Sequence, residues 1–306
     1  MATTSATRRR SGRFDFATTT LSFESEGTRC RGHLYRPDRP ATPPVVVLAP
    51  DLAAEATFGY TRYAERFARA GYAALALDYR GFGGSDGTRP AAIDPPAQAA
   101  DLDAAVDRVR RLDGERRRVV LWGHGLGGGH ALATAAASRR VSAVVAVAPL
   151  LDGRAFARRR SLGYLTRALR AGGRDRLLAP LGRSTTVPVV GGPREFGLLP
   201  RSRTGEAYLD LVPRGSDWAN ATPARGLLAL FRYRPITTLD DVNCPTLVVA
   251  AGADDLVASE TAATAADRID GSTLVRLPVG HVDPLGDAFE TAAAHQVTFL
   301  DGAVGR

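Results

Sequence analysis

The chain has 306 residues, of which 44% are hydrophobic and 24% are charged, so it can bury a core and is not mainly disordered. Its formal net charge is +8, and all 40 basic residues are arginines. Because these arginines are scattered and not interleaved with aromatic residues, we expect no nucleic-acid partner. No apolar run approaches the roughly 18 residues of a membrane-spanning helix, so no membrane partner is expected either.

The N-terminal residues and the two cysteines indicate the compartment of the protein. Residues 1–18 contain a basic cluster that no apolar segment follows, which predicts a disordered tail rather than a secretory signal. The only cysteines, Cys30 and Cys244, lie far apart and have no ligand partners at metal spacing. A disulfide framework is therefore not expected, and we predict a cytoplasmic protein.

Strand and helix patterns alternate along most of the chain. Residues 21–24 and 31–35 are predicted to form an antiparallel pair of edge strands. Apolar runs then predict strands at 45–49, 73–77, 119–122, 141–147, 246–250 and 273–277. Segments between them predict helices at 60–70, 98–112, 127–137, 261–269 and 289–300. Buried Val/Ala/Leu strands separated by helices indicate a parallel sheet covered on both faces.

One long segment interrupts this alternation. Residues 151–235 are rich in Arg, Gly and Pro and contain only short helical stretches, such as 164–171 and 225–231. We expect this segment to form an inserted cap. The core would then consist of residues 19–150 and 236–306.

The segment 119–129, VVLWGHGLGGG, lies between a predicted strand and a predicted helix. This is the context of the nucleophile elbow, whose pattern is G-x-S-x-G. Gly125 stands where that pattern has its nucleophile. Because glycine has no side chain, no acyl-enzyme can form at this position.

Further motifs accompany this segment: DYRGFGGSDG at 78–87, CPTLVV at 244–249 and GHVDP at 280–284. Together they resemble the α/β-hydrolase superfamily over residues 21–300, near the dienelactone-hydrolase-like and polyketide-transferase-like members of a capped bacterial branch. The resemblance implies an α/β fold with a mostly parallel sheet of about eight strands, helices on both faces and an inserted cap. It also implies a nucleophile, an acid and a histidine in that chain order.

The resemblance assigns two partners of the vacated nucleophile position. His281, after the strand at 273–277, corresponds to the catalytic histidine. The acid should follow the strand at 246–250, where the family places an Asp two residues before an apolar pair. That rule selects Asp254, while counting from the preceding glycine selects Asp255. His124, next to Gly125, is a further candidate.

A second departure from the family pattern lies after the strand at 45–49, where Pro50 and Asp51 replace His-Gly. The backbone N–H groups of Leu52 and Leu126 would form the oxyanion hole. A carboxylate at Asp51 would repel a developing oxyanion, so acyl transfer is disfavoured. Asp51 either faces His281 for acid–base chemistry or turns outward as a loop residue, and both alternatives stay open.

Three functions are compatible with these residues. The first is a non-hydrolytic enzyme of lyase, decarboxylase or cyclase type, which uses His281, Asp254 and Asp51 for proton transfer. Its substrate would be a small, apolar, natural-product-like molecule beneath cap aromatics such as Trp218 and Tyr208. The second is a serine esterase or acyltransferase inactivated by Ser-to-Gly replacement, and the third is a pseudoenzyme that binds a ligand or partner. No metal and no organic cofactor is expected, because the chain has no dinucleotide fingerprint or ligand cluster.

Overall fold

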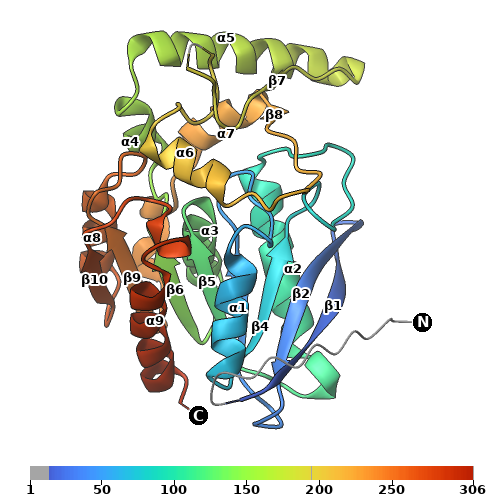
Figure 1. The fold of residues 1–306 in the computed structure, drawn as a ribbon, viewed down its shortest axis with the longest axis vertical. Helices are drawn as coiled ribbons and strands as arrows, with labels where there is room; N and C mark the ends of the chain where they lie inside the picture. Colours follow the sequence, from blue (N-terminus) through green and yellow to red (C-terminus); the bar gives the residue numbers. More distant parts are fainter. Residues whose placement is uncertain (1–13, 194, 306) are drawn as a thin grey trace.

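The computed structural model describes residues 14–193 and 195–305. An eight-stranded sheet lies at its centre, in the order β1-β2-β4-β3-β5-β6-β9-β10 (Figure 1). The strands are β1 (Phe16–Ser25), β2 (Thr28–Pro37), β3 (Val45–Ala49), β4 (Ala73–Asp78), β5 (Val119–His124), β6 (Ala143–Val147), β9 (Thr246–Ala251) and β10 (Thr273–Leu277). From β4 to β10 all neighbours are parallel, whereas β2 is antiparallel to both β1 and β4. The predicted α/β-hydrolase architecture is confirmed.

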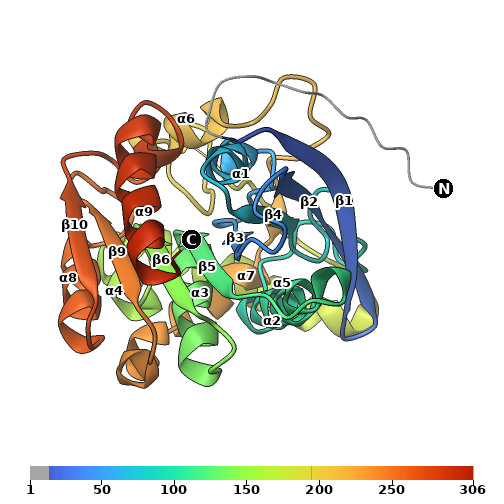
Figure 2. The same cartoon turned by 90° about the horizontal axis from the view of Figure 1, so that it is seen from below.

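Helices cover both faces of this sheet (Figure 2). The core helices are α1 (Tyr60–Arg69), α2 (Pro95–Arg110), α3 (Leu126–Ala137), α8 (Ser259–Arg268) and α9 (Phe289–Ala303). Helices α1 and α9 contact each other on one face, and α2 and α3 contact each other on the other. Short 3-10 helices lie at Leu112–Gly114, Ala179–Leu181, Pro235–Asp241 and Asp283–Leu285. Every residue of β3, β4, β5, β6 and β9 is buried, as their unbroken apolar sequences require.

Two predictions at the N-terminal end need correction. The disordered tail was expected to include residues 16–18, but these belong to β1, which pairs with β2 over its whole length. Residues 1–13 lie outside the described part of the chain. Strand β2 is not at an edge, because β4 pairs with its other side.

The segment between β6 and β9 lies over the carboxyl ends of the parallel strands (Figure 1). It contains α4 (Gly153–Arg158), α5 (Leu162–Leu178), β7 (Thr186–Val187), α6 (Arg203–Asp210), β8 (Thr222–Pro223) and α7 (Arg225–Arg232). We call this segment the cap. Its outermost element is α5, which packs on α7. Across the described residues, none of the helices combines the length and apolarity needed to cross a bilayer.

Candidate active site

A sharp turn joins β5 to α3 at the centre of the sheet. Strand β5 ends at His124, and α3 begins at Leu126. Gly125 between them has φ 53° and ψ −118°, a backbone conformation that residues other than glycine rarely adopt. The Gly125 N–H donates to the carbonyl of Val147 at 3.0 Å, which ties the turn to β6. The predicted strand–turn–helix at Gly125 is therefore confirmed.

Asp51, two residues after the end of β3, points into this turn. Its backbone N–H donates to the hydroxyl oxygen of Tyr60 at 2.9 Å, and its Oδ1 accepts from the Leu126 N–H at 2.6 Å. A Cβ atom built on Gly125 would overlap the Asp51 carboxylate. The carboxylate therefore fills the space that a side chain at position 125 would need. Of the two orientations left open for Asp51, the structure has the inward one.

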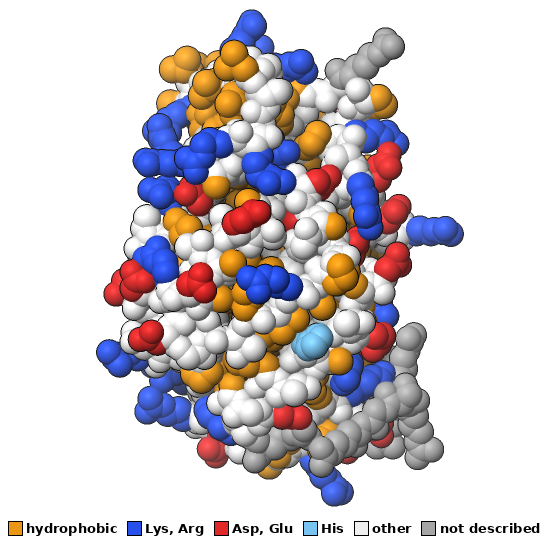
Figure 3. Space-filling model, turned by 90° about the vertical axis from the view of Figure 1, so that its left-hand side faces the viewer, with side chains coloured by type: hydrophobic (Ala, Val, Ile, Leu, Met, Phe, Trp, Pro, Cys, Tyr) orange, Lys and Arg blue, Asp and Glu red, His pale blue; other side chains and the backbone are white. Residues whose placement is uncertain are grey.

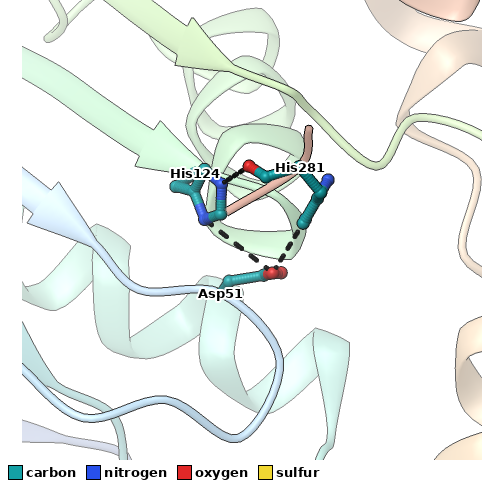
Figure 4. A group of neighbouring side chains, drawn as sticks. All are labelled: Asp51, His124 and His281. Carbon is teal, nitrogen blue, oxygen red and sulfur yellow. Dashed lines mark hydrogen bonds and ion pairs between the residues drawn. The ribbon is translucent and has the colours of Figure 1, made fainter. Parts of the chain in front are cut away.

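His281 lies between two carboxylates. Its Nδ1 is 2.7 Å from Asp254 Oδ2. Its Nε2 is 3.1 Å from Asp51 Oδ2, the contact that Figure 4 shows. The other Asp254 oxygen accepts from the N–H groups of Leu256 and Val257, each at 2.8 Å, which fixes the carboxylate.

The neighbouring Asp255 has a different partner. Its Oδ1 accepts a hydrogen bond from the Thr204 hydroxyl, in the cap. Of the two acids that the sequence offers, Asp254 is thus the partner of His281.

His124 supports the backbone of His281. Its Nε2 is 2.8 Å from the His281 carbonyl, and because a carbonyl only accepts, His124 carries its proton on Nε2. Its Nδ1 faces Asp51 Oδ2 at 3.8 Å and has no hydrogen-bond partner in the described part of the chain (Figure 4). The position of His124 is thus set by a main-chain contact, with the ring resting beside the carboxylate.

The ionisation of these groups follows from their arrangement. Burial lowers the pKa of His281, but the charges and hydrogen bonds of Asp254 and Asp51 outweigh it and raise that pKa to about 10. Burial raises the pKa of Asp51, but His281, His124 and the Leu126 N–H lower it overall, to about 2. The pKa of Asp254 is also lowered, because His281 outweighs its burial. Burial and the charge of His281 lower the pKa of His124 to about 4. Near neutral pH the site holds an imidazolium between two carboxylates.

Asp51, His124 and His281 have ligand-type atoms within 4.8 Å of one another, the one such group in the described residues. Their spacing is compatible with a metal ion. Both ring nitrogens of His281 already have carboxylate partners, however. The imidazolium therefore supplies the positive charge that these carboxylates need.

The expected oxyanion hole is not open. Leu126 was predicted to offer its N–H to a substrate oxyanion, but that N–H is bonded to Asp51. The cause is steric, because with no side chain at Gly125 the Asp51 carboxylate reaches the Leu126 N–H first. Leu52 is the second predicted donor. Its carbonyl oxygen accepts a hydrogen bond from the Tyr208 hydroxyl at 2.6 Å, which fixes the backbone at this residue.

The cap is anchored directly above Asp51. Besides Tyr208, Trp218 donates from Nε1 to the carbonyl of Ala53 at 2.9 Å. The ring of Phe58 lies edge-on to both, with centroid distances of 6.0 Å to Tyr208 and 5.5 Å to Trp218. The exposed fraction is 3% for Asp51 and 1% for His281, so both side chains are shielded from bulk solvent.

The role of Tyr60 was not found from the sequence. Tyr60 begins α1, and its hydroxyl accepts the Asp51 N–H that orients the loop after β3. A tyrosine at a helix start carries no pattern that would signal this contact. The Tyr60 hydroxyl comes close to the Asp51 N–H only once α1 has packed against the sheet, so the contact depends on the tertiary structure.

Comparisons with known proteins agree with this architecture. The family described as serine aminopeptidase, S33, matches residues 43–178. The quorum-quenching protein AidA of Acinetobacter baumannii (strain MDR-ZJ06) is 32% identical over 286 residues, covering 92% of this chain and 93% of its own length. The polyketide transferase grgF of a Penicillium species is 33% identical over 174 residues, 55% of this chain and 57% of its own. The crystal structure of the α/β hydrolase GrgF from Penicillium sp. sh18 superposes with a TM-score of 0.80 at 23% identity, covering 94% of this chain and 99% of that one.

Proposed function

This chain belongs to the α/β-hydrolase superfamily, in the same family as the quorum-quenching protein AidA, and within it we propose an enzyme that works without a nucleophilic serine. The observation that carries this proposal is the position of Asp51. Its carboxylate occupies the space of a side chain at residue 125 and is bonded to both Leu126 and His281. An acyl-enzyme on residue 125 has no atom to form on and no room to form in.

The arrangement is suited to proton transfer. His281, protonated between Asp254 and Asp51, is a general acid, and it leaves a carboxylate–imidazole pair that takes a proton back. In a buried site these charges act without competition from water. The reaction class that fits is elimination, decarboxylation, cyclisation or rearrangement, which need an acid and a base but no acyl-enzyme.

The substrate in this proposal is a small, apolar, natural-product-like molecule. An apolar substrate is supported by a group of aromatic side chains beside Asp51. Tyr208 and Trp218 of the cap pack there against Phe58, which belongs to the loop between β3 and α1. A relative named polyketide transferase supports the natural-product class. No step in this chemistry calls on a metal or an organic cofactor.

Solvent proton exchange tests the proposal without requiring the natural substrate. A β-keto acid and a β-hydroxy ketone are incubated in D₂O with the wild type, Asp51→Asn and His281→Ala, and deuterium incorporation and product formation are followed by mass spectrometry. We expect the wild type to accelerate exchange or conversion, and both variants to lose about a hundredfold or more of that rate. Asp255→Asn removes a charge next to Asp254 but leaves both carboxylate partners of His281 in place, so it should retain the wild-type rate. Equal rates in wild type and His281→Ala would refute proton-transfer catalysis and favour a ligand-binding pseudoenzyme.

A second assay addresses the alternative of an esterase disabled at one residue. Turnover of p-nitrophenyl acetate is compared for Gly125→Ser alone and for Gly125→Ser combined with Pro50→His and Asp51→Gly. We expect the single variant to give little or no turnover, because the new serine meets the Asp51 carboxylate. The combined variant should give more, since it opens the Leu126 N–H to an oxyanion. Robust turnover from Gly125→Ser alone would favour the disabled esterase.

A further inference from the structure

Helix α5 (Leu162–Leu178) is held firmly by its inner face. Ala168, Gly172 and Asp175 are buried there, and a Cβ on Gly172 would come within 2.7 Å of Leu228 of α7. The Asp175 carboxylate accepts from Arg225 Nε at 2.6 Å and from the Thr185 N–H at 2.6 Å. These contacts fix which side of α5 faces outward.

The outward side carries a row of leucines that we call the leucine stripe: Leu162, Leu169 and Leu177 of α5, and Leu181 of the following 3-10 helix (Ala179–Leu181). Their exposed fractions are 77%, 58%, 80% and 71%. Spacings of seven and eight residues place the three α5 leucines on one helix face. In the described part of the chain, all of the large hydrophobic side chains that stand exposed belong to this stripe. A concentration of exposed apolar side chains on one helix and the turn that follows it is typical of an interaction surface.

Arginines flank the leucine stripe. Arg167, Arg170, Arg174 and Arg176 are exposed on α5, whereas its one acidic residue, Asp175, is buried beneath it. Figure 3 shows hydrophobic side chains bordered by arginines at the top of the molecule, where α5 lies. The outer face of α5 is therefore apolar at its centre and positively charged at its margins.

A basic cavity lies beside the C-terminal end of this helix. It has a volume of about 550 Å³, and Arg176 and Ala179 line it together with arginines of neighbouring elements. Those arginines are Arg89, Arg225, Arg232 and Arg234. Arg225 and Arg234 are paired with Asp175 and Asp152. Asp94 is the one acid among the lining residues, so the lining keeps a net positive charge beside the leucine stripe, which suits a phosphate group.

We propose that the outer face of α5 docks the protein on the surface of a bilayer that contains anionic lipid. The leucines would enter the boundary between headgroups and acyl chains, and the flanking arginines would lie at the level of the lipid phosphates. A second copy of this chain fits less well, because it would bring exposed arginines against arginines with no exposed acid on α5 to pair with them. The sequence leads us to expect no membrane partner, because no segment is long and apolar enough to span a bilayer. This proposal departs from that expectation, since docking on a surface needs no spanning helix.

Vesicle co-sedimentation tests this docking. The full chain is mixed with vesicles of phosphatidylcholine alone and with vesicles that also contain about 30% phosphatidylglycerol. We expect binding to the second and little binding to the first, with affinity falling as salt is raised. Leu169→Gln/Leu177→Gln and Arg170→Gln/Arg174→Gln should each weaken binding about tenfold or more. Arg111→Gln/Arg116→Gln makes the same change of charge near the start of β5, at the opposite end of the sheet, and should bind as the wild type does.

The result that overturns the proposal is equal binding by the wild type and the leucine variant, or no binding to phosphatidylglycerol vesicles. Light scattering provides the other decisive readout. A wild-type dimer that Leu169→Gln/Leu177→Gln converts to a monomer would assign the leucine stripe to a second copy instead. Since the substituted side chains are exposed, the variants should unfold at the wild-type temperature. Proton exchange in free solution is measured without vesicles, so failure of either proposal is separable from the other.

Discussion

Asp51 and Gly125 follow two different strands, β3 and β5, and share one space, which makes the two residues interdependent. We predict that Gly125→Ala lowers the free energy of unfolding more than Gly27→Ala does. Both glycines have positive φ, 53° and 75°, so both substitutions incur strain of about 1–2 kcal/mol. A Cβ at Gly27 meets nothing within 4 Å, whereas at Gly125 it overlaps Asp51, which should add about 1–3 kcal/mol. Urea unfolding measures both losses, and equal losses would contradict the shared space.

The two carboxylates around His281 give a prediction about pH. His281 has a folded pKa of about 10, so the stability from its protonated form is complete below about 6.5, its unfolded pKa, and is lost as the pH rises through 10. Asp51→Asn removes one of the two charges that oppose the effect of burial, so the pKa of His281 should fall and the stability should be lost at lower pH. The His281 ring titration by NMR and unfolding between pH 6 and 10 measure these shifts. Asp255→Asn, which leaves both partners of His281 in place, should shift the titration less.

Some of the contacts of single residues in the site could be predicted from the sequence. The apolar pair Leu256–Val257 correctly selected Asp254, because the N–H groups of those two residues hold its carboxylate. The orientation of Asp51 was not predictable. It depends on an N–H from α3, a hydroxyl from α1 and a ring from the loop after β10, all brought together only by the sheet.

At the scale of elements, adjacent glycines in α5 offer a matched comparison. Gly173→Ala should stabilise the protein by up to about 1 kcal/mol, because its Cβ meets nothing within 4 Å and alanine favours helix. Gly172→Ala should destabilise it by about 1–3 kcal/mol, because its Cβ lies 2.7 Å from Leu228 Cγ and 3.0 Å from the Ala224 carbonyl. Thermal unfolding of the two variants checks the difference in sign. A gain in both would mean that α5 and α7 are not closely packed.

These glycines also explain why the sequence underestimated α5. A helix was expected only at 164–171, because Gly172 and Gly173 weaken the local helical pattern, but the helix continues to Leu178. Close packing on α7 compensates for the low helix propensity of glycine. The strands at the centre of the sheet were predicted within a few residues, since full burial leaves an unbroken apolar run that needs no tertiary information.

At the scale of the whole molecule, one of the contacts that join the cap to the core lies over the loop after β3, where Tyr208 meets Leu52. We predict that Tyr208→Phe speeds amide hydrogen exchange in residues 51–58, because the Leu52 carbonyl loses its buried donor, at a cost of about 1–3 kcal/mol. Tyr164→Phe is the matched control. It removes the same group, but its hydroxyl donates to Leu198 within the cap, so exchange in 51–58 should not change. Faster exchange in both variants would mean that the cap loosens as a unit rather than at this contact.

The space shared by Asp51 and Gly125 also constrains the descent of this protein. A side chain at position 125 and an inward carboxylate at position 51 exclude each other, so we expect the two residues to have changed in a linked way. A single substitution of Gly125 by serine is disfavoured in the same way, because the serine would meet Asp51. Relatives with a serine or cysteine at the turn are accordingly expected to have glycine or another small residue in place of Asp51. A double-mutant cycle over the two positions should show strong epistasis, with Gly125→Ser costing less stability in combination with Asp51→Gly than alone.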